Sequence, residues 1–331
     1  MPITLEQAKV GMADKVDQQV VDEFRRSSLL LDRLVFDNAV SPGTGGSTLT
    51  YGYQRLKTPS TAQFRDINQE YKANEADRED IYVKLKIFGG AFEIDRVIQD
   101  TSGQIDEMQF QLQQKIIGAR NLFHYTVING DSAVDSKAFD GLNKALAGSS
   151  TELNKNGVID VSTSAAIEAD KFALLDAIDS FLSELDGRPT MLMGNNKLIT
   201  KIKSVARRAG YLTQSEDAFG RTVDAYDNIP LVDLGYFVQV SGGTPTTVPV
   251  VPIVQRTINT QNVTGLTDLY AVSIGLDGFH GVTVTGNSVI RTYLPDFKSP
   301  GAVKKGEVEM VAAIALKATR KAGVLRNIKV A

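Results

Sequence analysis

The residue types that most often carry enzyme chemistry are scarce in this chain of 331 residues. It has no cysteine and only two histidines, His124 and His280. Each histidine lacks a second His, Cys or carboxylate at metal-ligand spacing, so we expect a packing or turn role for both. The absence of cysteine also removes thiol catalysis, disulfides and zinc–thiolate sites. No catalytic, cofactor-binding or metal-binding residue is predicted, and the chain is not expected to be an enzyme.

Three polar stretches have residue types that could bind a ligand. The glycine-rich segment 43–47 lacks the Lys of a phosphate loop and comes before a strand, which favours a hinge. The carboxylates from Glu70 to Asp80 lack the spacing and turn glycine of a calcium loop, which favours a solvated tip. The predicted helix 196–209 could contact nucleic acid or an acidic neighbour, although a solvated face is the commoner explanation. Its basic residues are Lys197, Lys201, Lys203, Arg207 and Arg208.

The overall composition favours a folded chain with no membrane partner. Hydrophobic residues make up 42% and charged residues 23% of the sequence, and no run of about 18 apolar residues is present. The net charge of -3 and the pI near 5.6 argue against a protein whose main task is binding nucleic acid, because neutralising phosphates needs a basic surplus. The first residues lack the apolar core of a signal peptide, so secretion by that route is not expected.

The longest element predicted is a helix from Ser102 to Gly130. Thr101 or Ser102 can cap its start, and Asn129 and Gly130 are types that tolerate the left-handed conformation at a helix end. Apolar residues recur at steps of three and four, which predicts one buried stripe. The stripe consists of Ile105, Met108, Leu112, Ile116, Ala119, Phe123 and Val127. Such a helix would be roughly 40 Å long and could act as a spine.

A long β hairpin is predicted just before this helix, with strands at 47–56 and from Ile81 onward. Alternating residues should share one apolar face: Leu49, Tyr51, Tyr53, Ile81, Val83, Leu85 and Ile87. Two strands alone are only marginally stable, because a ribbon cannot bury its own face. We therefore expect the cover to come from another subunit. The tip between the strands, 57–80, is polar, and 65–80 carries six carboxylates against three cations.

The remaining chain divides into an arm, a mixed domain and a strand-rich end. Apolar residues from Val20 predict an arm helix ending near Asn38, followed by a flexible break at 41–46. Residues 169–286 mix helices and strands. From Asp296 to Lys329 there are eight cations against three carboxylates, so the acidic tip and the basic tail of neighbouring copies could meet. The charged candidates for this contact are Glu75, Asp77, Lys317, Arg320 and Lys321.

The order of these parts resembles the tailed-bacteriophage major capsid protein family, which has the Hong Kong 97 shell fold. The resemblance rests on segments 84–94, 192–196, 313–319 and 324–328 in their order along nearly the whole chain. It implies an α+β fold with an N-terminal arm, an extended β-hairpin loop, a long spine helix, and peripheral and axial domains. The implied divisions are arm 1–46, extended loop 47–92, peripheral domain with spine helix 93–150, axial domain 151–286, and C-terminal strands 287–331 returning to the peripheral domain.

The resemblance also implies a function and partners. The chain would self-assemble, as pentamers and hexamers, into the icosahedral head shell enclosing a double-stranded DNA genome. It would be a virion protein assembled in the host cytoplasm, with a separate scaffolding protein, a portal and a decoration protein as partners and non-specific contact with packaged DNA. An encapsulin-like nanocompartment shell is the alternative. Flexible joints at 41–46, 89–90 and 300–301 would let one sequence fit different neighbours.

Crosslinking between a loop Lys and a distant Asn is known in that family. Lys57, Lys72 and Asn327 are residues of the required types, but no residue match assigns a pair.

Overall fold

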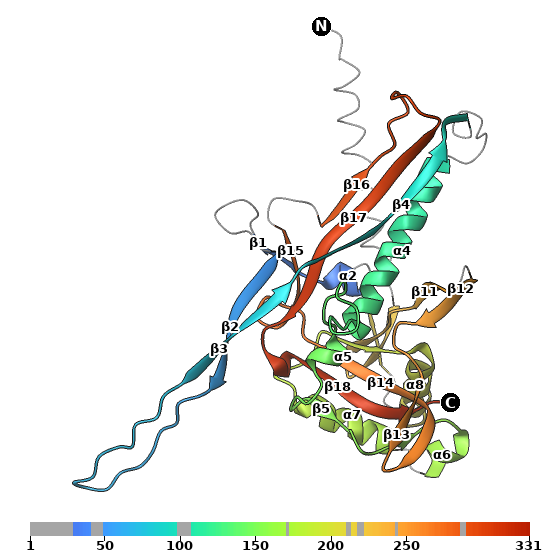
Figure 1. The fold of residues 1–331 in the computed structure, drawn as a ribbon. Helices are drawn as coiled ribbons and strands as arrows, with labels where there is room; N and C mark the ends of the chain where they lie inside the picture. Colours follow the sequence, from blue (N-terminus) through green and yellow to red (C-terminus); the bar gives the residue numbers. More distant parts are fainter. Residues whose placement is uncertain are drawn as a thin grey trace.

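A computed structural model describes residues 29–40, 49–97, 107–169, 172–209, 213–216, 222–241, 244–284 and 289–331. The chain is α+β and forms a body built on two sheets, from which a long hairpin projects (Figure 1). The expected break and hinge at 41–48 and the expected helix start at Thr101 and Ser102 lie outside the described residues, as does most of the expected arm helix.

The first sheet has five strands and carries the spine helix α4 (Glu107–Asn129). Its strand order is β1, β15, β17, β16, and β4 pairs with β17. Their bounds are β1 Phe36–Val40, β4 Lys86–Asp95, β15 Phe279–Val284, β16 Ile290–Tyr293 and β17 Val303–Leu316. Helix α4 packs along β4 and β17, and the short helix α2 (Leu29–Arg33) precedes β1.

The second sheet has nine strands and lies below the first in Figure 1. Its main path is β5, β18, β14, β7, β10, β9, β8, with β13 and β6 pairing from the side. The bounds are β5 Glu152–Leu153, β6 Ile159–Asp160, β7 Met191–Gly194, β8 Thr213–Glu216, β9 Thr222–Tyr226, β10 Ile229–Asp233, β13 Val254–Ile258, β14 Gln261–Val272 and β18 Ala322–Lys329.

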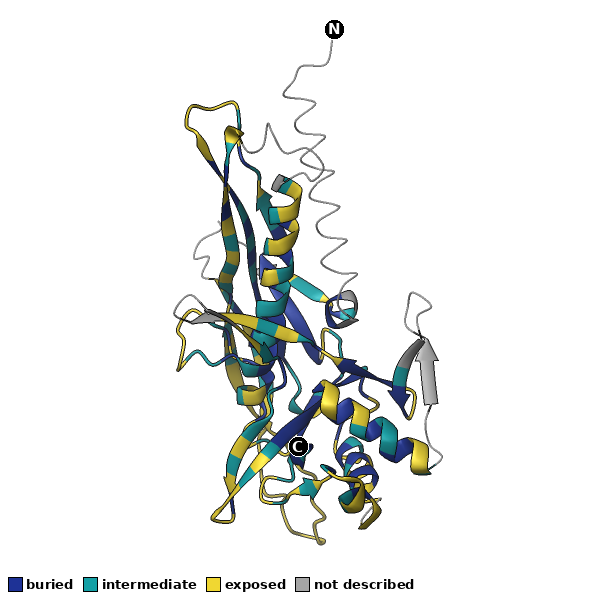
Figure 2. Ribbon diagram, turned by 90° about the vertical axis from the view of Figure 1, so that its right-hand side faces the viewer, coloured by how far each residue is buried: buried dark blue, intermediate teal, exposed yellow. Residues whose placement is uncertain are grey.

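Helices and small elements cover the second sheet and join it to the first. Helix α7 (Ala173–Ser183) packs against β18, and α8 (Asn196–Ala209) packs against α7 and β10. Figure 2 shows that the helices at this end have one buried and one exposed face. The other small elements are α5 Leu142–Ala145, α6 Ser164–Ala169, the 3-10 helix Thr319–Lys321 and the β11–β12 hairpin, Tyr236–Ser241 with Thr244–Pro249.

The buried stripe predicted for α4 is confirmed where the helix is described. Leu112, Ile116, Ala119, Phe123 and Val127 are buried, and Met108 packs against the same core. The ring of Phe123 stacks 6.0 Å from that of Phe88 on β4 and lies 5.9 Å from that of Phe139. The spine helix is therefore fixed to the sheet by an aromatic core.

The predicted reason for the end of α4 is wrong. Neither Asn129 nor Gly130 is among the described residues with a left-handed backbone. Gly130 instead ends the helix at a crowded place, because a Cβ there would lie 2.1 Å from the carbonyl oxygen of Phe139. The Gly141 amide donates to the Gly130 carbonyl at 2.8 Å, so glycine is needed for close approach of two backbone segments.

Two other expectations are corrected by the strand pairing. The segment expected to end a helix near Asn38 is strand β1, which pairs in parallel with β15. The joint expected at Gly89 and Gly90 lies inside β4, and a Cβ on Gly89 would lie 1.9 Å from the Val308 carbonyl oxygen. At the joint expected at 300–301, the Lys304 ammonium donates to the Pro300 carbonyl at 3.0 Å.

The C-terminal segment 287–331 divides between the two sheets. Strands β16 and β17 lie in the sheet that carries α4, but β18 pairs with β14, β5 and β6 in the second sheet. The expectation that these C-terminal strands all return beside the spine helix does not hold for β18. Its apolar residues are buried on both faces, which is typical of a strand inside a covered sheet.

Candidate assembly interface

The predicted hairpin is present as β2 (Thr50–Thr58) and β3 (Asp77–Lys84), which pair in antiparallel fashion. The predicted alternation continues only to Leu85, where the chain leaves β3, and β4 begins at Lys86. Leu85 is 3% exposed, whereas Ile87 is 59% exposed. Ile87 therefore does not share the buried face with Leu85 as predicted, because the break between β3 and β4 reverses the side that the chain presents.

The root of the hairpin packs on its own chain. Tyr51 is 7% exposed, and its hydroxyl donates to the Asp37 carboxylate at 2.9 Å. Its ring lies 5.9 Å from that of His280 and 5.5 Å from the Lys317 ammonium. Burial raises the pKa of Tyr51 despite the hydrogen bond with Lys317, so the hydroxyl stays protonated. For Tyr51 and Leu85 the predicted cover from another subunit is wrong, because this chain's own body supplies it.

Two side chains of β2 attach the hairpin to the end of β17. The Tyr53 hydroxyl donates to the Leu316 carbonyl at 2.8 Å. Arg55 donates from one guanidinium nitrogen to the same carbonyl at 2.7 Å and from Nε to the Lys317 carbonyl at 3.0 Å. Burial raises the pKa of Tyr53, so its hydroxyl remains a donor. The hairpin thus supplies hydrogen-bond donors to the backbone carbonyls of Leu316 and Lys317.

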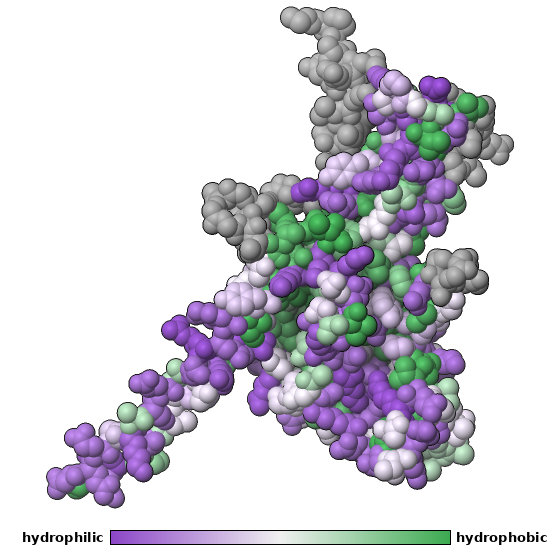
Figure 3. Space-filling view, in the orientation of Figure 1, coloured by the Kyte–Doolittle hydropathy of each residue, from purple (hydrophilic) through white to green (hydrophobic). Residues whose placement is uncertain are grey.

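A groove of about 640 Å³ lies beneath the hairpin root, between β3 and the loop that precedes α5. We call it the root groove. Its apolar lining includes Ile81, Val83, Phe139, Leu142 and Ile314. Ile81 and Val83 are only half-buried, so the two predicted interface residues in the middle of β3 still lack full cover. In Figure 3 apolar surface is visible in the hollow where the hairpin leaves the body.

The charged lining of the root groove is mainly basic among the described residues. It contains Arg55, Lys84, Lys86 and Lys144 against the single carboxylate of Asp140. Lys144 contacts Asp140 at 2.9 Å as well as a second carboxylate, and Lys86 donates to a carbonyl of the facing loop. Lys84 is exposed on the rim. The groove therefore combines an apolar floor with a positive edge.

The far end of the hairpin is exposed over its whole length. Every residue from 56 to 80 is exposed, and the described contacts of this segment are with other hairpin residues. We call residues 59–76 the tip. Three large apolar side chains of the tip, Phe64, Ile67 and Tyr71, are 63% or more exposed. The Gln69 amide donates to the Asp66 carbonyl at 3.2 Å and forms a turn between them.

The charged residues predicted for a contact between tip and tail have different surroundings. Glu75 and Asp77 are exposed on the hairpin, and Asp77 lies 3.6 Å from Lys57. Lys321 instead pairs with Asp186 of its own chain at 3.1 Å. Other tail cations are also paired internally: Lys304 with the 299–300 carbonyls, Lys305 with Glu307, Arg326 with Glu152 and Asp268, and Lys329 with Asp160.

Fewer cations of the tail are therefore available for a contact with another copy than its composition suggests. Of the predicted contact residues, Arg320 is exposed and Lys317 is half-buried beside Tyr51. Leu49, at the start of β2, is 41% exposed. The structure thus groups Tyr53, Ile81 and Val83 at one groove but does not bring the acidic tip and basic tail of one chain together.

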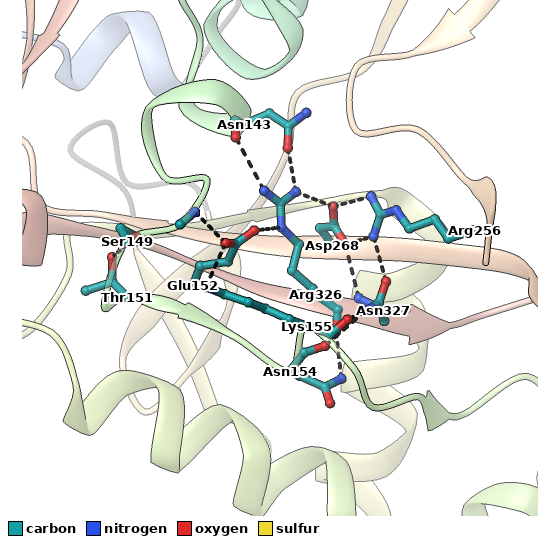
Figure 4. A network of polar contacts seen from close by, with 11 residues as sticks. Asn143, Ser149, Thr151, Glu152, Asn154, Lys155, Arg256, Asp268, Arg326 and Asn327 are labelled. Carbon is teal, nitrogen blue, oxygen red and sulfur yellow. Dashed lines mark hydrogen bonds and ion pairs between the residues drawn. The ribbon is translucent and has the colours of Figure 1, made fainter. Parts of the chain in front are cut away.

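A buried ionic cluster lies where β5 meets β13, β14 and β18 (Figure 4). We define it as Glu152, Arg256, Asp268 and Arg326. Asp268 is 4% exposed and accepts from Arg256 at 2.6 Å and from Arg326 at 2.9 Å. Arg326 also donates to Glu152 at 2.9 Å. Burial alone would raise the pKa of Asp268, but the two guanidinium groups outweigh it and lower that pKa.

The sequence reasoning did not find this cluster. One signal was present, since Arg326 lies among the apolar residues Leu325 and Ile328, and a charge inside a buried strand needs partners. Asn327, a predicted crosslinking type, is 3% exposed. Its amide donates to the Asn154 and Lys155 carbonyls at 3.0 and 2.9 Å. Within one chain it is therefore a structural residue, not an accessible acceptor.

The two histidines and the basic helix considered in the sequence contact other groups of their own chain. His124 and His280 are buried, and burial lowers the pKa of both, that of His124 to about 3. On α8, Lys201 donates to the Ser162 carbonyl, and Lys203 and Arg208 pair with carboxylates of their own chain. Among the described residues no group of three or more His, Asp or Glu could hold a metal ion. None of the helices described is long and apolar enough to cross a membrane.

Comparison with known proteins gave one family and one fold. The family model described as SU10 major capsid protein matches residues 30–229. No curated protein matches the chain. Among solved structures, the SrpI encapsulin of Synechococcus elongatus PCC 7942 has 15% identity and a TM-score of 0.58, covering 91% of this chain and 87% of that chain.

Two further structures show the same fold. The capsid of a native GTA particle has 11% identity and a TM-score of 0.52, covering 88% of this chain and 89% of that chain. The satellite phage P4 procapsid, solved with its size determination (Sid) protein, has 10% identity and a TM-score of 0.50, covering 95% and 100%. At these identities the likeness concerns the fold, which is that of viral and encapsulin shells.

Proposed function

Because the chain belongs to the SU10 major capsid protein family, and so is a structural protein of a phage head shell, we propose that its subunits join through the hairpin. In this proposal the tip of one subunit lies in the root groove of a neighbouring subunit. The observation that carries the proposal is the match between three exposed apolar side chains on the tip and an incompletely covered apolar groove.

The direction of the hairpin supports a contact with a second copy. The tip projects away from the body that holds its own root groove (Figure 1). Phe64, Ile67 and Tyr71 therefore lie far from the groove of their own chain. Burial of each side chain contributes about 1.5–3 kcal/mol, which gives the exposed tip a strong preference for a covered site.

Charge supports the same pairing. The tip turn carries Asp66 and Glu70 beside its apolar residues, and both carboxylates are exposed. The rim of the groove carries Lys84 and Arg55. Opposite charges at the edge of an interface mainly set orientation and specificity, while the apolar centre supplies most of the affinity.

The wider assembly follows from the same premise. We propose that pentamers and hexamers of the chain form an icosahedral shell in the host cytoplasm around double-stranded DNA. The sheet with α4 would form the peripheral domain and the nine-stranded sheet the axial domain. A scaffolding protein, a portal and a decoration protein would be separate partners. The P4 procapsid, which contains a size determination protein, supports the idea of an assembly partner.

Tip variants test the docking proposal. Replacing Phe64, Ile67 and Tyr71 together by Ser should abolish closed shells, because the apolar contact with the groove is lost. The circular dichroism spectrum of the subunit should not change, because these side chains are outside the core. Negative-stain microscopy would score the particles. Leu56→Ser is the matched control, since Leu56 is exposed on the same hairpin but outside the tip. Normal shells from the triple variant would refute the proposal.

A charge exchange sharpens the test. Lys84→Glu and Glu70→Lys should each reduce the yield of closed shells, and the two changes combined should restore part of it. Restoration would place the acidic tip beside the basic rim of another copy. Equal losses in the single and double variants would contradict that placement.

A nanocompartment shell is the second candidate function, because the SrpI encapsulin has the highest TM-score of the three structures described above. An encapsulin encloses protein cargo, whereas a phage head encloses a genome. Particles purified from the native source would distinguish them by their content: nuclease-protected DNA supports the phage head, and a copurifying enzyme without DNA supports the nanocompartment.

A further inference from the structure

We propose that Arg55 is a positioning residue that sets the direction in which the hairpin projects, by tying β2 to the connection between the two sheets. The proposal concerns contacts within one subunit. It rests on the proposed function only in that a correctly directed hairpin is needed to reach a neighbour.

Arg55 marks the boundary between the attached and the projecting parts of the hairpin. On β2, Tyr51 is buried and Tyr53 and Arg55 are half-buried, while every residue from 56 to 80 is exposed. The hydrogen bonds of Arg55 to the Leu316 and Lys317 carbonyls are therefore the outermost described contacts between hairpin and body. Its pairing with Glu79 across the hairpin, at 4.0 Å, is weak by comparison.

The two acceptor carbonyls lie where the chain passes from one sheet to the other. Leu316 is the last residue of β17 in the five-stranded sheet, and β18 of the nine-stranded sheet begins at Ala322. The backbone at this point is itself held, because the Lys317 amide donates to the Gly278 carbonyl at 3.1 Å. A shift between the two sheets would move these carbonyls, and with them the guanidinium of Arg55.

The guanidinium suits this role better than an ammonium. It presents donors in a planar fork, and here Nε and a terminal nitrogen reach two successive carbonyls at 3.0 and 2.7 Å. Two bonds from one rigid group define an orientation, whereas a lysine acts as a point charge on a flexible stem. The Tyr53 hydroxyl adds a third bond to the Leu316 carbonyl at 2.8 Å.

The length of the hairpin makes the angle at Arg55 important. From Arg55 to Ile67 an extended chain spans up to roughly 40 Å at about 3.3 Å per residue. A rotation of about 10° at the root would then move the tip by about 7 Å, which is larger than the width of a side chain. One contact pair at the root could thus direct the tip to neighbours in slightly different positions.

The test measures the direction of the hairpin in unassembled subunits. The chain has no cysteine, so two introduced cysteines, Gln69→Cys at the tip and Asn156→Cys on the body, can carry spin labels. Pulsed electron resonance then reports the distance distribution between them. Arg55→Met, which keeps the stem but removes the donors, should broaden and shift this distribution by several ångströms. Arg55→Lys should give an intermediate distribution.

Arg78→Met is the matched control, because Arg78 is exposed on β3 and bonds within the hairpin, to Gln54. It should leave the distribution unchanged. Full-chain Arg55→Met should also yield open or irregular particles by electron microscopy, with partial recovery of closed shells in Arg55→Lys. An unchanged distance distribution in Arg55→Met would overturn the proposal, as would regular shells from a variant whose distribution has broadened.

The Arg55 variants and the tip variants test the two proposals separately. If tip variants assemble normally while Arg55→Met broadens the distance distribution and disrupts shells, the positioning role stands and the docking proposal fails. If only the tip variants disrupt shells, the docking proposal stands and the positioning role fails.

Discussion

Two charge-rich regions of the molecule, the hairpin beyond Arg55 and the ionic cluster around Asp268, differ in how their polar groups are satisfied. In the cluster, Asp268 and Arg326 are 4% and 8% exposed and every charge faces an opposite charge of the same chain. On the hairpin, Lys57 and Asp77 pair at 3.6 Å with both side chains 61% exposed. Similar residue types therefore do different things in the two places.

This difference shows in which region the side chains find all their partners within one subunit. A buried ion pair that loses one partner leaves an unpaired charge out of water, so the cluster must be fully satisfied within the chain. An exposed pair contributes little to folding, and exposed apolar residues beside it remain available for another surface. We infer that the cluster serves the fold, while the hairpin serves contacts between subunits.

The strongest test of this contrast is removal of the hairpin end. Replacing 57–77 by an Asn-Gly turn, which joins the paired residues Leu56 and Arg78 as a two-residue hairpin connection, should leave the folded body intact, because residues 57–77 are exposed. The variant should fail completely to form closed shells. Thermal unfolding and electron microscopy on the same preparation would measure both properties.

The deletion can contradict the contrast in two ways. Closed particles of normal appearance would show that the hairpin end is not needed for assembly. A large drop in the unfolding temperature would show that it belongs to the folded body.

Asp268→Ala tests the other side of the comparison. It should lower the free energy of unfolding by about 3–5 kcal/mol, because two guanidinium groups would lose their shared carboxylate in a buried site. Asp77→Ala, which breaks the exposed pair with Lys57, should change it by about 0–1 kcal/mol. Urea unfolding of both variants beside the wild type gives the two values. Equal effects would remove the distinction between the regions.

The sequence predicted those elements that depend on local periodicity. The stripe on α4, helix α8 from Asn196 to Ala209 and the pairing of β2 with β3 are confirmed. In each case the apolar residues recur with the helix period of 3.6 or the strand period of 2, and this period can be read from residues close together in the sequence. The family resemblance was confirmed for the same reason, since it rests on the order of such elements.

Features that depend on distant contacts were missed. The inversion at Leu85 and Ile87 arises because β4 leaves β3 and pairs with β17, where Ile87 lies opposite Val311. Asn327 was considered for a crosslink on its residue type alone, but its side chain is buried and donates to the Asn154 and Lys155 carbonyls. Of the residues predicted for a subunit interface, Ile81 and Val83 line the root groove, whereas cover for Tyr51 comes from β1 and β15 of its own chain.

An effect smaller than that of Asp268→Ala is a pH dependence that arises from the body alone. Burial, together with the nearby charge of Arg120, lowers the pKa of His124 from 6.5 to about 3, although a hydrogen bond with the Leu234 backbone opposes the shift. The unfolded chain therefore binds a proton below pH 6.5 that the folded chain does not bind, so stability falls as pH falls. At 1.36 kcal/mol per pH unit the loss of stability is about 2 kcal/mol at pH 5.

Urea unfolding at pH 7 and 5 should show this loss equally in the wild type and the hairpin deletion, since His124 lies in the core. His124→Gln should retain only the smaller dependence expected from His280. A pH dependence that disappears when the hairpin is deleted would instead assign it to the exposed carboxylates and undo the contrast.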